Sequence, residues 1–247
     1  DLLLFFIPFL MLKANTNINS KTDFLEGQLI LFHKPLRWSS FDVVKKVRNI
    51  IKTTNNLKKI KVGHAGTLDP LADGLLIICT GKLTKRIEEV QEQKKIYSGE
   101  ITLGATTPSY DRETDVNKTF DTSHINEELI LETCKKFEGK IMQKPPIFSA
   151  LKREGKRLYQ HAREGTNVLI KARKIEVEKF DITDINIPKL KFKVSCSKGT
   201  YIRSLAHDFG EKLNCGAYLT SLRREQIGNF KLDEAYTIDC FQEKILI

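Results

Sequence analysis

Apolar residues recur with the period of an α-helix in three segments of the chain. Residues 41–51 place an apolar side chain at every third or fourth position. Ser39 precedes this segment and stands three residues before Asp42, the spacing of a capping box, which predicts that a helix begins here. Residues 125–137 and 200–214 are predicted as two further helices on the same grounds.

Four other segments have the patterns of β-strands. Residues 28–32 and 75–79 are short, continuous apolar runs that end at turn-forming residues. Residues 97–103 and 190–196 alternate between apolar and polar positions, as half-buried strands do. Helices and strands are interleaved without strict βαβ order, which predicts an α+β fold with a mixed sheet.

The first 26 residues differ from the remainder of the chain. Residues 1–12 are almost entirely apolar, but the run is too short to span a bilayer and no basic segment precedes it. We interpret it as a start-site artefact, with Met11 as a candidate initiator, and we expect residues 15–24 to form a polar, disordered leader. Because no repeat or linker divides the rest, residues 27–247 are predicted to form one domain.

The charge of the chain is strongly basic and unevenly distributed. The 247 residues include 41 Lys and Arg against 31 Asp and Glu, a formal charge of +10. Residues 135–174 hold twelve Lys or Arg against three Glu, so the rest of the chain is nearly neutral in total. Such a segment is typical of a protein that grips phosphates at one place, although a solvated surface loop has the same composition. Aromatic residues and prolines within the segment favour contact with RNA.

Cysteine and histidine residues indicate neither a disulfide framework nor a zinc site. The five cysteines are scattered without a CxxC pair, a usage that suits reduced thiols in a cytosol. The five histidines form no HxxxH or Cys/His cluster, so no metal ligands are predicted.

The densest group of turn residues lies at residues 63–74. Three glycines and Pro70 predict a tight, irregular loop that can direct a polar side chain into a cleft. Asp69 lies between Leu68 and Pro70, and apolar surroundings of this kind tune the reactivity of a carboxylate. An Asp before Pro more often caps a turn, and the spacing alone favours that simpler interpretation.

The loop sequence GHAGTLDPLADGLL resembles the signature loop of the bacterial tRNA pseudouridine-55 synthases, the TruB family. Four other stretches resemble the family in order and spacing: LFHKP at 31–35 with Ser39-Ser40, KIY at 95–97 with Leu103-Gly104, QKPPIFSALK at 143–152 with Gly155, and GTYIRSLA at 199–206 with Leu222-Arg223-Arg224. The match extends over residues 27–239. It implies a pseudouridine-synthase-like mixed, mostly antiparallel sheet flanked by helices, with a basic RNA-gripping insertion at 143–165 in the catalytic domain.

The same resemblance implies the site residues. Asp69 matches the family's essential aspartate, which attacks the target nucleoside or removes a proton from it. Tyr97 matches the ring that stacks on the flipped uracil and assists proton removal at C5, and Arg203 matches the arginine that pairs with the aspartate. His64 matches the residue that helps hold open the site of the extruded nucleotide. Further substrate-binding positions are implied at Lys34, Tyr201, Leu222, Lys152 and Arg153.

Each of these residues also has a simpler interpretation when its own pattern is considered alone. Tyr97 falls on the apolar positions of its alternating strand, as Ile101 does, and could be a core residue. Arg203 on a helix would usually lie on the surface. Tyr201 and Leu222 are explained as packing residues, and His64 as a partner of the glycine loop's backbone.

The implied reaction isomerises uridine-55 in the T-loop of tRNA. It needs no cofactor because it is neither a redox step nor a group transfer. We expect tRNA as the partner, no membrane and no obligatory protein partner, a monomer, and a cytoplasmic location. The chain ends soon after residues 232–235, so we expect no PUA-type RNA-binding domain and a weaker grip on the acceptor side.

Three positions depart from the family pattern. His33 stands where Asp is common, and Asp73 stands where Thr is common, which places a second carboxylate four residues from Asp69. Residues 105–115 lack the family's Thr-Asp-Thr run, although Asp111 matches a later acidic position.

Two other functions would use the same basic segment or pocket. An RNA chaperone that refolds the T-arm would need the basic residues but not Asp69. A base-excising glycosidase would release free base, whereas isomerisation leaves the mass of the RNA unchanged.

Overall fold

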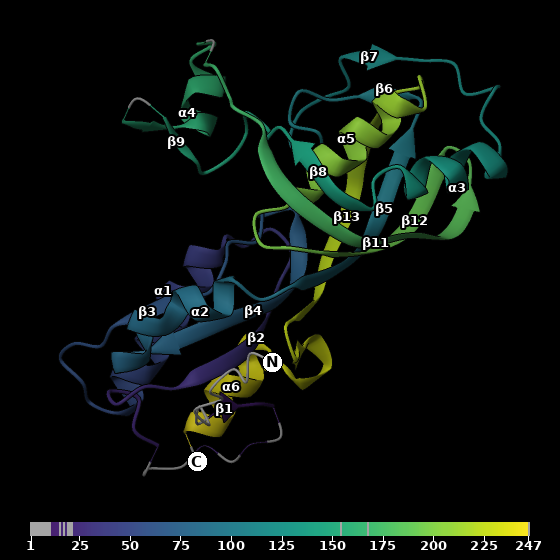
Figure 1. The fold of residues 1–247 in the computed structure, drawn as a ribbon. Coiled ribbons are helices and arrows are strands. Elements are labelled where there is room, and N and C mark those ends of the chain that lie inside the picture. The colour runs from purple at the N-terminus through teal and green to yellow at the C-terminus, as the bar shows by residue number, and fades with distance from the viewer. Residues whose placement is uncertain are drawn as a thin grey trace. The chain divides into compact units, whose positions relative to one another are not determined.

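A computed structural model describes residues 11–14, 16, 18, 22–153, 155–166 and 168–246. The chain divides into two compact units, whose elements are labelled in Figure 1. Unit 1 takes the chain up to Gln93 and again from Arg223, and unit 2 takes Lys94–Leu222. No glycine, proline or linker composition marks either boundary, so the sequence did not indicate this division. That residues 27–247 act as one catalytic domain stays a prediction.

Unit 1 is built on a sheet of order β1-β2-β4-β13, with β3 paired to the end of β4. β1 and β2 are parallel, whereas β2 and β3 each run antiparallel to β4. The elements are β1 (Met11–Leu12), β2 (Leu29–Lys34), α1 (Ser40–Thr54), β3 (Val62–His64), β4 (Ala72–Thr80), a 3₁₀ turn (Gly81–Arg86), α2 (Ile87–Gln91), the second half of β13 (Ala217–Ile227), β14 (Phe230–Lys231), a 3₁₀ turn (Leu232–Glu234) and α6 (Ile238–Ile245).

Both faces of the unit 1 sheet are buried. Leu29 and Leu31 of β2 face one apolar cluster, which includes Val90 of α2. Ile30 and Phe32 face a second cluster, which is formed with α1 and α6. The continuous apolar run that predicted β2 reflects this burial on two sides, because successive side chains of a strand point to opposite faces.

Helix α1 begins where the capping box predicted. The Ser39 hydroxyl accepts from the Asp42 amide at 3.1 Å, and the Asp42 carboxylate accepts from the Ser39 amide at 2.8 Å. Val44 and Val47 face the core as expected. Phe41, which the periodicity assigned to the same face, is 59% exposed, because the buried face runs through Ser40, Val43, Val44 and Val47 and Phe41 lies to one side of it.

The described residues before Gly27 belong to unit 1. Leu12, Ile18 and Phe24 are all buried, and β1 pairs with Leu29 and Ile30 of β2. The disordered leader expected at residues 15–24 therefore does not hold for its described residues, because their apolar side chains complete the core cluster under α1 and α6. The apolar run at residues 1–10 lies outside the described residues.

Unit 2 contains a sheet of order β13-β5-β12-β11-β8, in which β5–β12, β12–β11 and β11–β8 are antiparallel. The elements are β5 (Lys95–Leu103), β6 (Ala105–Thr106), β7 (Lys118–Thr119), α3 (Glu127–Lys135), β8 (Gly139–Gln143), β9 (Lys152–Arg153), β10 (Lys156–Arg157), α4 (Leu158–Arg163), β11 (Arg173–Asn186), β12 (Lys189–Cys196), α5 (Ile202–Lys212) and the first half of β13.

A group of phenylalanine rings fixes the helices of unit 2 on its sheet. Phe180 of β11 contacts Phe192 of β12 edge-on, with ring centroids 6.0 Å apart. Phe209 of α5 and Phe137, which follows α3, also meet the Phe180 ring edge-on, at 5.5 and 6.5 Å. Edge-to-face pairs of this kind add to the stability that burial provides.

Residues 143–165 lie in unit 2 and have a local structure of their own. β9 and β10 form a two-stranded hairpin, and α4 follows directly. Leu158 is buried, and its amide donates to the Leu151 carbonyl at 2.8 Å. The segment around Pro145 and Pro146 is irregular, as the prolines predicted.

The predicted fold class, α+β with a mixed, mostly antiparallel sheet, is confirmed. β1–β2 is the parallel pair among the strand pairs given above. Every predicted helix and strand is present, and no end is shifted by more than three residues. In the described portion, no helix combines the length and the apolar character that crossing a membrane requires.

Candidate active site

The predicted site residues are divided between the two units. Unit 1 holds three of them, and unit 2 holds the other six. The unit 1 residues are Lys34, His64 and Asp69. The unit 2 residues are Tyr97, Lys152, Arg153, Tyr201, Arg203 and Leu222.

Asp69 lies in the irregular loop between β3 and β4. The Ala65 amide donates to the Ile77 carbonyl at 2.8 Å, and the Ala72 amide donates to the Asp69 carbonyl at 3.0 Å, so both ends of the loop are tied to ordered structure. Asp69 itself is half-buried. Leu68 is buried but Pro70 is exposed, so the expected apolar surroundings are formed on one side of Asp69 along the chain.

The loop backbone next to Asp69 is held by the start of α1. The Ser40 hydroxyl accepts from the Leu68 amide at 2.8 Å and donates to the Leu68 carbonyl at 3.1 Å. Ser40 is buried, and the Arg37 amide donates to the Pro70 carbonyl at 2.7 Å. Residues on both sides of Asp69 are therefore fixed by the turn and first residue of one helix.

Arg224 holds the same loop from β13. Its Nη2, Nη1 and Nε donate to the carbonyl oxygens of Gly66, Thr67 and Leu75 at 3.1, 3.2 and 2.7 Å. Arg224 is 1% exposed, so losing it would leave these acceptors without their donor. Arg224 lies in one of the stretches that resemble the family, but no role was predicted for it. The available signal was its position two residues after Leu222, on the buried phase of a strand.

Lys34 ends β2, and His64 ends β3 just before the loop. The Lys34 ammonium donates to the carbonyls of Pro35 and Trp38 at 2.9 and 2.6 Å. Burial lowers the pKa of Lys34 to about 8, against an opposing effect of nearby Asp73 and Asp69. Burial also lowers the pKa of His64, and repulsion by Arg224 adds to this effect.

The two departures at residues 33 and 73 contact each other. His33 Nε2 lies 3.1 Å from Asp73 Oδ2, and the Arg223 guanidinium binds the same carboxylate with Nη2 at 2.7 Å. Burial raises the pKa of Asp73, but the hydrogen bonds from Arg223 and His33 outweigh it and leave the pKa below its ordinary value. Asp73 is thus an ion-paired carboxylate.

In unit 2, Arg203 is buried at the start of α5. Its Nη1 donates to the Ser109 carbonyl at 3.2 Å, and its Nε lies 3.6 Å from Asp111 Oδ2. Arg203 is 4% exposed and Asp111 is 5% exposed. The surface position that a helical Arg usually takes is therefore excluded. Asp111 orients this guanidinium, a contact that the local sequence pattern did not reveal.

Tyr97 and Leu222 are both buried on strands of unit 2. Tyr97 stands opposite Val194 in the β5–β12 register. Tyr201 precedes α5, where its amide donates to Gln143 Oε1 at 2.8 Å and its carbonyl accepts from Gln143 Nε2 at 3.0 Å. The Arg173 guanidinium lies 4.8 Å from the centroid of the Tyr201 ring. Gln143, at the end of β8, therefore links Tyr201 to the start of the insertion.

Lys152 and Arg153 are exposed on β9. In the hairpin, Lys152 stands opposite Arg157 and Arg153 stands opposite Lys156. Like charges directly opposite each other on neighbouring strands repel. The hairpin therefore presents four cations close together, of which Lys156 is paired with Glu164 at 2.9 Å.

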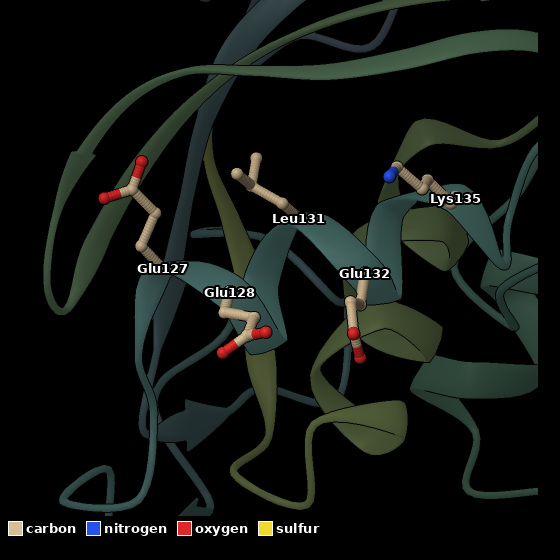
Figure 2. Close-up of a pocket in the computed structure, with 5 residues that line it drawn as sticks. All are labelled: Glu127, Glu128, Leu131, Glu132 and Lys135. Atoms are coloured by element: carbon tan, nitrogen blue, oxygen red, sulfur yellow. The ribbon is translucent and has the colours of Figure 1, made fainter.

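A pocket of about 530 Å³ on α3 does not have a lining suited to RNA binding. Figure 2 shows its lining side chains projecting from one helix, with Glu127 and Leu131 on one side and Glu128 and Glu132 on another. Three carboxylates against Lys135 would repel a phosphate backbone. Among the described residues, no group of three His, Cys, Asp or Glu side chains is arranged to hold a metal ion.

Comparison with known proteins identifies the family. Residues 52–202 match the N-terminal domain of the TruB family pseudouridylate synthases, and residues 203–247 match the C-terminal domain of tRNA pseudouridylate synthase B. The tRNA pseudouridine synthase B of Flavobacterium johnsoniae is 55% identical over 224 residues, which cover 90% of this chain and 98% of that protein. The protein of the same name from Chloroherpeton thalassium is 50% identical, with 90% and 91% covered.

Solved structures agree with this assignment. A chain in the crystal structure of a Cbf5–Nop10–Gar1 complex has a TM-score of 0.67 and is 29% identical, with 90% of this chain matched. The match spans 56% of that chain, just over half its length. The protein therefore belongs to the TruB family. It is a tRNA pseudouridine synthase, an isomerase that converts uridine to pseudouridine in tRNA.

Proposed function

We propose that the uridine isomerised is uridine-55 in the T-loop of tRNA, and that Asp69 is the essential carboxylate. The proposal is supported mainly by the way the Asp69 loop is held. Ser40 and Arg224 bind the backbone of residues 66–68, and Arg37 binds the Pro70 carbonyl. A carboxylate on a fixed backbone is pre-organised for attack or proton transfer, which a mobile loop would not provide.

The proposed reaction is intramolecular. The bond from C1′ to N1 of the uracil breaks, the ring rotates, and a bond from C1′ to C5 forms as the C5 proton leaves and N1 gains a proton. Atoms and electrons balance without a donor or an oxidant. The uracil must first leave the base stack, which costs a few kcal/mol.

The remaining site residues have proposed roles in this sequence. Tyr97 stacks on the flipped uracil and assists proton removal at C5. Arg203, oriented by Asp111 and the Ser109 carbonyl, pairs with the Asp69 carboxylate and keeps it ionised. His64 is biased toward its neutral form by its lowered pKa, which suits a side chain that helps hold open the site of the extruded nucleotide.

Contacts to the RNA backbone are assigned to the insertion. Lys152 and Arg153 neutralise phosphates of the T-arm, and Lys34, Tyr201 and Leu222 support the pocket. We further propose that the protein acts as a monomer in the cytoplasm without an obligatory protein partner. Sedimentation with and without tRNA tests whether the protein is a monomer.

Carbodiimide mapping of pseudouridine in an unmodified tRNA transcript tests the function. We expect one new stop at position 55 and an unchanged RNA mass. A stop at a different uridine would overturn the position, and released free base would indicate a glycosidase. An Asp69→Asn protein that still forms pseudouridine would show that Asp69 is not the essential group. RNA refolding without any pseudouridine would indicate a chaperone.

A further inference from the structure

Unit 1 carries a second concentration of positive charge, which the balance of the whole chain conceals. Residues 34–61 hold nine Lys or Arg and one acidic residue, Asp42. The chain outside residues 135–174 is nearly neutral in total because acidic residues elsewhere offset this stretch. Helix α1 lies within it, so these charges have fixed positions.

Part of this charge lines a groove at the start of α1. The groove has a volume of about 440 Å³. Its lining comprises Arg37, Trp38, Asp42, Lys45, Lys46 and Asn49. The last four follow each other at i, i+3, i+4 and i+7, so they form one face of the helix, and the first two belong to the turn that precedes it.

The cations of the groove are available to a ligand. Arg37, Lys45 and Lys46 are exposed, and none of them has an ion-pair partner within the described residues of the chain. Asp42 is the one carboxylate of the lining. Its Oδ2 accepts from the amide and the hydroxyl of Ser39 at 2.8 and 2.6 Å, so it is engaged in capping the helix.

The indole of Trp38 gives the groove an aromatic surface. Trp38 is half-buried and packs against the core cluster under α1, which restricts its motion. Its carbonyl accepts from the buried Lys34 ammonium at 2.6 Å, which closes the turn. Cations beside a fixed aromatic ring form the arrangement that binds single-stranded nucleic acid, with phosphates on the cations and a base on the ring.

The position of the groove indicates which nucleic acid would bind. Arg37 donates its amide to the carbonyl of Pro70, the residue that follows Asp69. Arg37 also has a backbone φ of +69°, which a non-glycine residue seldom adopts and which is common at ligand-binding sites. An RNA strand whose uridine reaches Asp69 therefore passes close to this turn.

We propose that this groove binds the substrate RNA next to the flipped uridine, with its phosphates at Arg37, Lys45 and Lys46 and one base on Trp38. The inference rests on the proposed function, because it requires that Asp69 receives the target nucleotide. It adds a second RNA contact, on unit 1, to the one that the insertion provides on unit 2.

Trp38 provides a direct measurement because it is the single tryptophan of the chain. Titration of the full-length protein with a T-arm stem-loop should change the fluorescence of Trp38, and the anisotropy of an end-labelled stem-loop at several salt concentrations gives the affinity of every variant, including those that lack Trp38. We expect Arg37→Ala/Lys45→Ala/Lys46→Ala to weaken binding and to flatten the slope of log affinity against log salt by roughly 2, at about 0.7 to 0.9 for each phosphate contact. Trp38→Ala should weaken binding on the order of tenfold, and Trp38→Phe should restore most of it.

The matched control is Lys58→Ala/Lys59→Ala/Lys61→Ala, which removes the same charge from unit 1 beyond the end of α1. An equal loss in both triple variants would mean that only net charge matters and would overturn the proposal, as would unchanged Trp38 fluorescence at saturating RNA. Pseudouridine formation by the unaltered protein is measured in parallel. Its absence would refute the proposed function, whereas full activity together with triple and Trp38 variants that bind normally would refute only the groove.

Discussion

Asp69 in the β3–β4 loop and Asp73 at the start of β4 lie four positions apart, yet their surroundings differ. The Asp73 carboxylate is bound by Arg223 and His33, whereas the neighbours of Asp69 are held through their backbone by Ser40 and Arg224. The contacts with Arg223 and His33 join Asp73 of β4 to β13 and β2, so this carboxylate links three strands of unit 1. The structure therefore gives the second carboxylate a stabilising role.

This difference predicts opposite outcomes for two matched substitutions. Asp69→Asn should abolish pseudouridine formation and leave tRNA binding nearly unchanged. Asp73→Asn should keep most activity and lower the free energy of unfolding by about 1 kcal/mol, since its partner Arg223 is half exposed. Single-turnover assays measure the activity of both variants, and urea unfolding measures their free energy of unfolding. An inactive Asp73→Asn beside an active Asp69→Asn would reverse the assignment.

Asp208 of α5 predicts a dependence of stability on pH. Burial, with a contribution from Glu211, raises the pKa of Asp208 from 3.8 to about 6. The folded protein therefore binds more protons than the unfolded chain between about pH 4 and 6, so this residue makes stability fall as pH rises through that range.

Asp208→Asn should remove the effect, because it keeps the size of the side chain but not its charge. We expect roughly 1–3 kcal/mol more stability at pH 7.5 and no gain near pH 4. Urea unfolding at the two pH values measures the difference. An equal gain at both would mean that the charge of Asp208 is not the cause.

At the scale of elements, the β9–β10 hairpin is destabilised by repulsion between its own charges. Lys152 opposes Arg157 and Arg153 opposes Lys156, and these like charges repel until an anion neutralises them. The hairpin should therefore become more stable when RNA phosphates bind, as expected of the basic RNA-gripping insertion at 143–165.

Changing these four residues together to Ala should weaken tRNA binding and flatten the slope of log affinity against log salt by roughly 3, without moving the modified uridine. The control changes four ion-paired lysines of unit 2, which alters the net charge equally: Lys94, Lys179, Lys189 and Lys191. Hydrogen exchange across residues 143–165 should slow when tRNA is added. An unchanged salt slope, or full protection without RNA, would show that the segment is a structural arm.

At the scale of the whole molecule, segments near the two ends of the sequence join in unit 1. The Ala14 amide donates to the Glu234 carbonyl at 2.8 Å, and Tyr236 Oη donates to the Thr16 carbonyl at 2.9 Å. The buried side chains of Leu12 and Ile18 share a core cluster with α1 and α6. Helix α6 and β1 lie together in Figure 1, so this segment is part of the fold.

Removing residues 1–21 should therefore destabilise the protein. The lost burial of Leu12 and Ile18 corresponds to about 3–6 kcal/mol. Urea unfolding measures this, with Leu12→Ala expected at about 2–3 kcal/mol. Lys13→Ala is the contrasting control, since it removes only a partly exposed ion pair with Glu234 and should change stability by less than about 1 kcal/mol. A truncated protein as stable as the full chain would show that residues 1–21 are a leader that does not stabilise the fold.

The sequence by itself determined the features that depend on neighbouring residues. The Ser39–Asp42 cap, the helices, the alternating strands and the glycine-bounded loop all follow from hydrogen bonding and side-chain period within one segment. The resemblance of five such segments to one family determined the activity. The leader was misjudged because its few apolar residues show no period, and their burial depends on helices encoded elsewhere.

The tertiary structure alone decided how the loop of Asp69 is held. Ser40 meets Leu68 across 28 residues of sequence, and Arg224 meets Gly66 across 158. The pairing of His33 with Asp73 joins residues 40 apart, and the burial of Arg203 against Asp111 joins two more distant segments of unit 2. No local pattern encodes such contacts, because they exist only once segments from different parts of the chain have packed together.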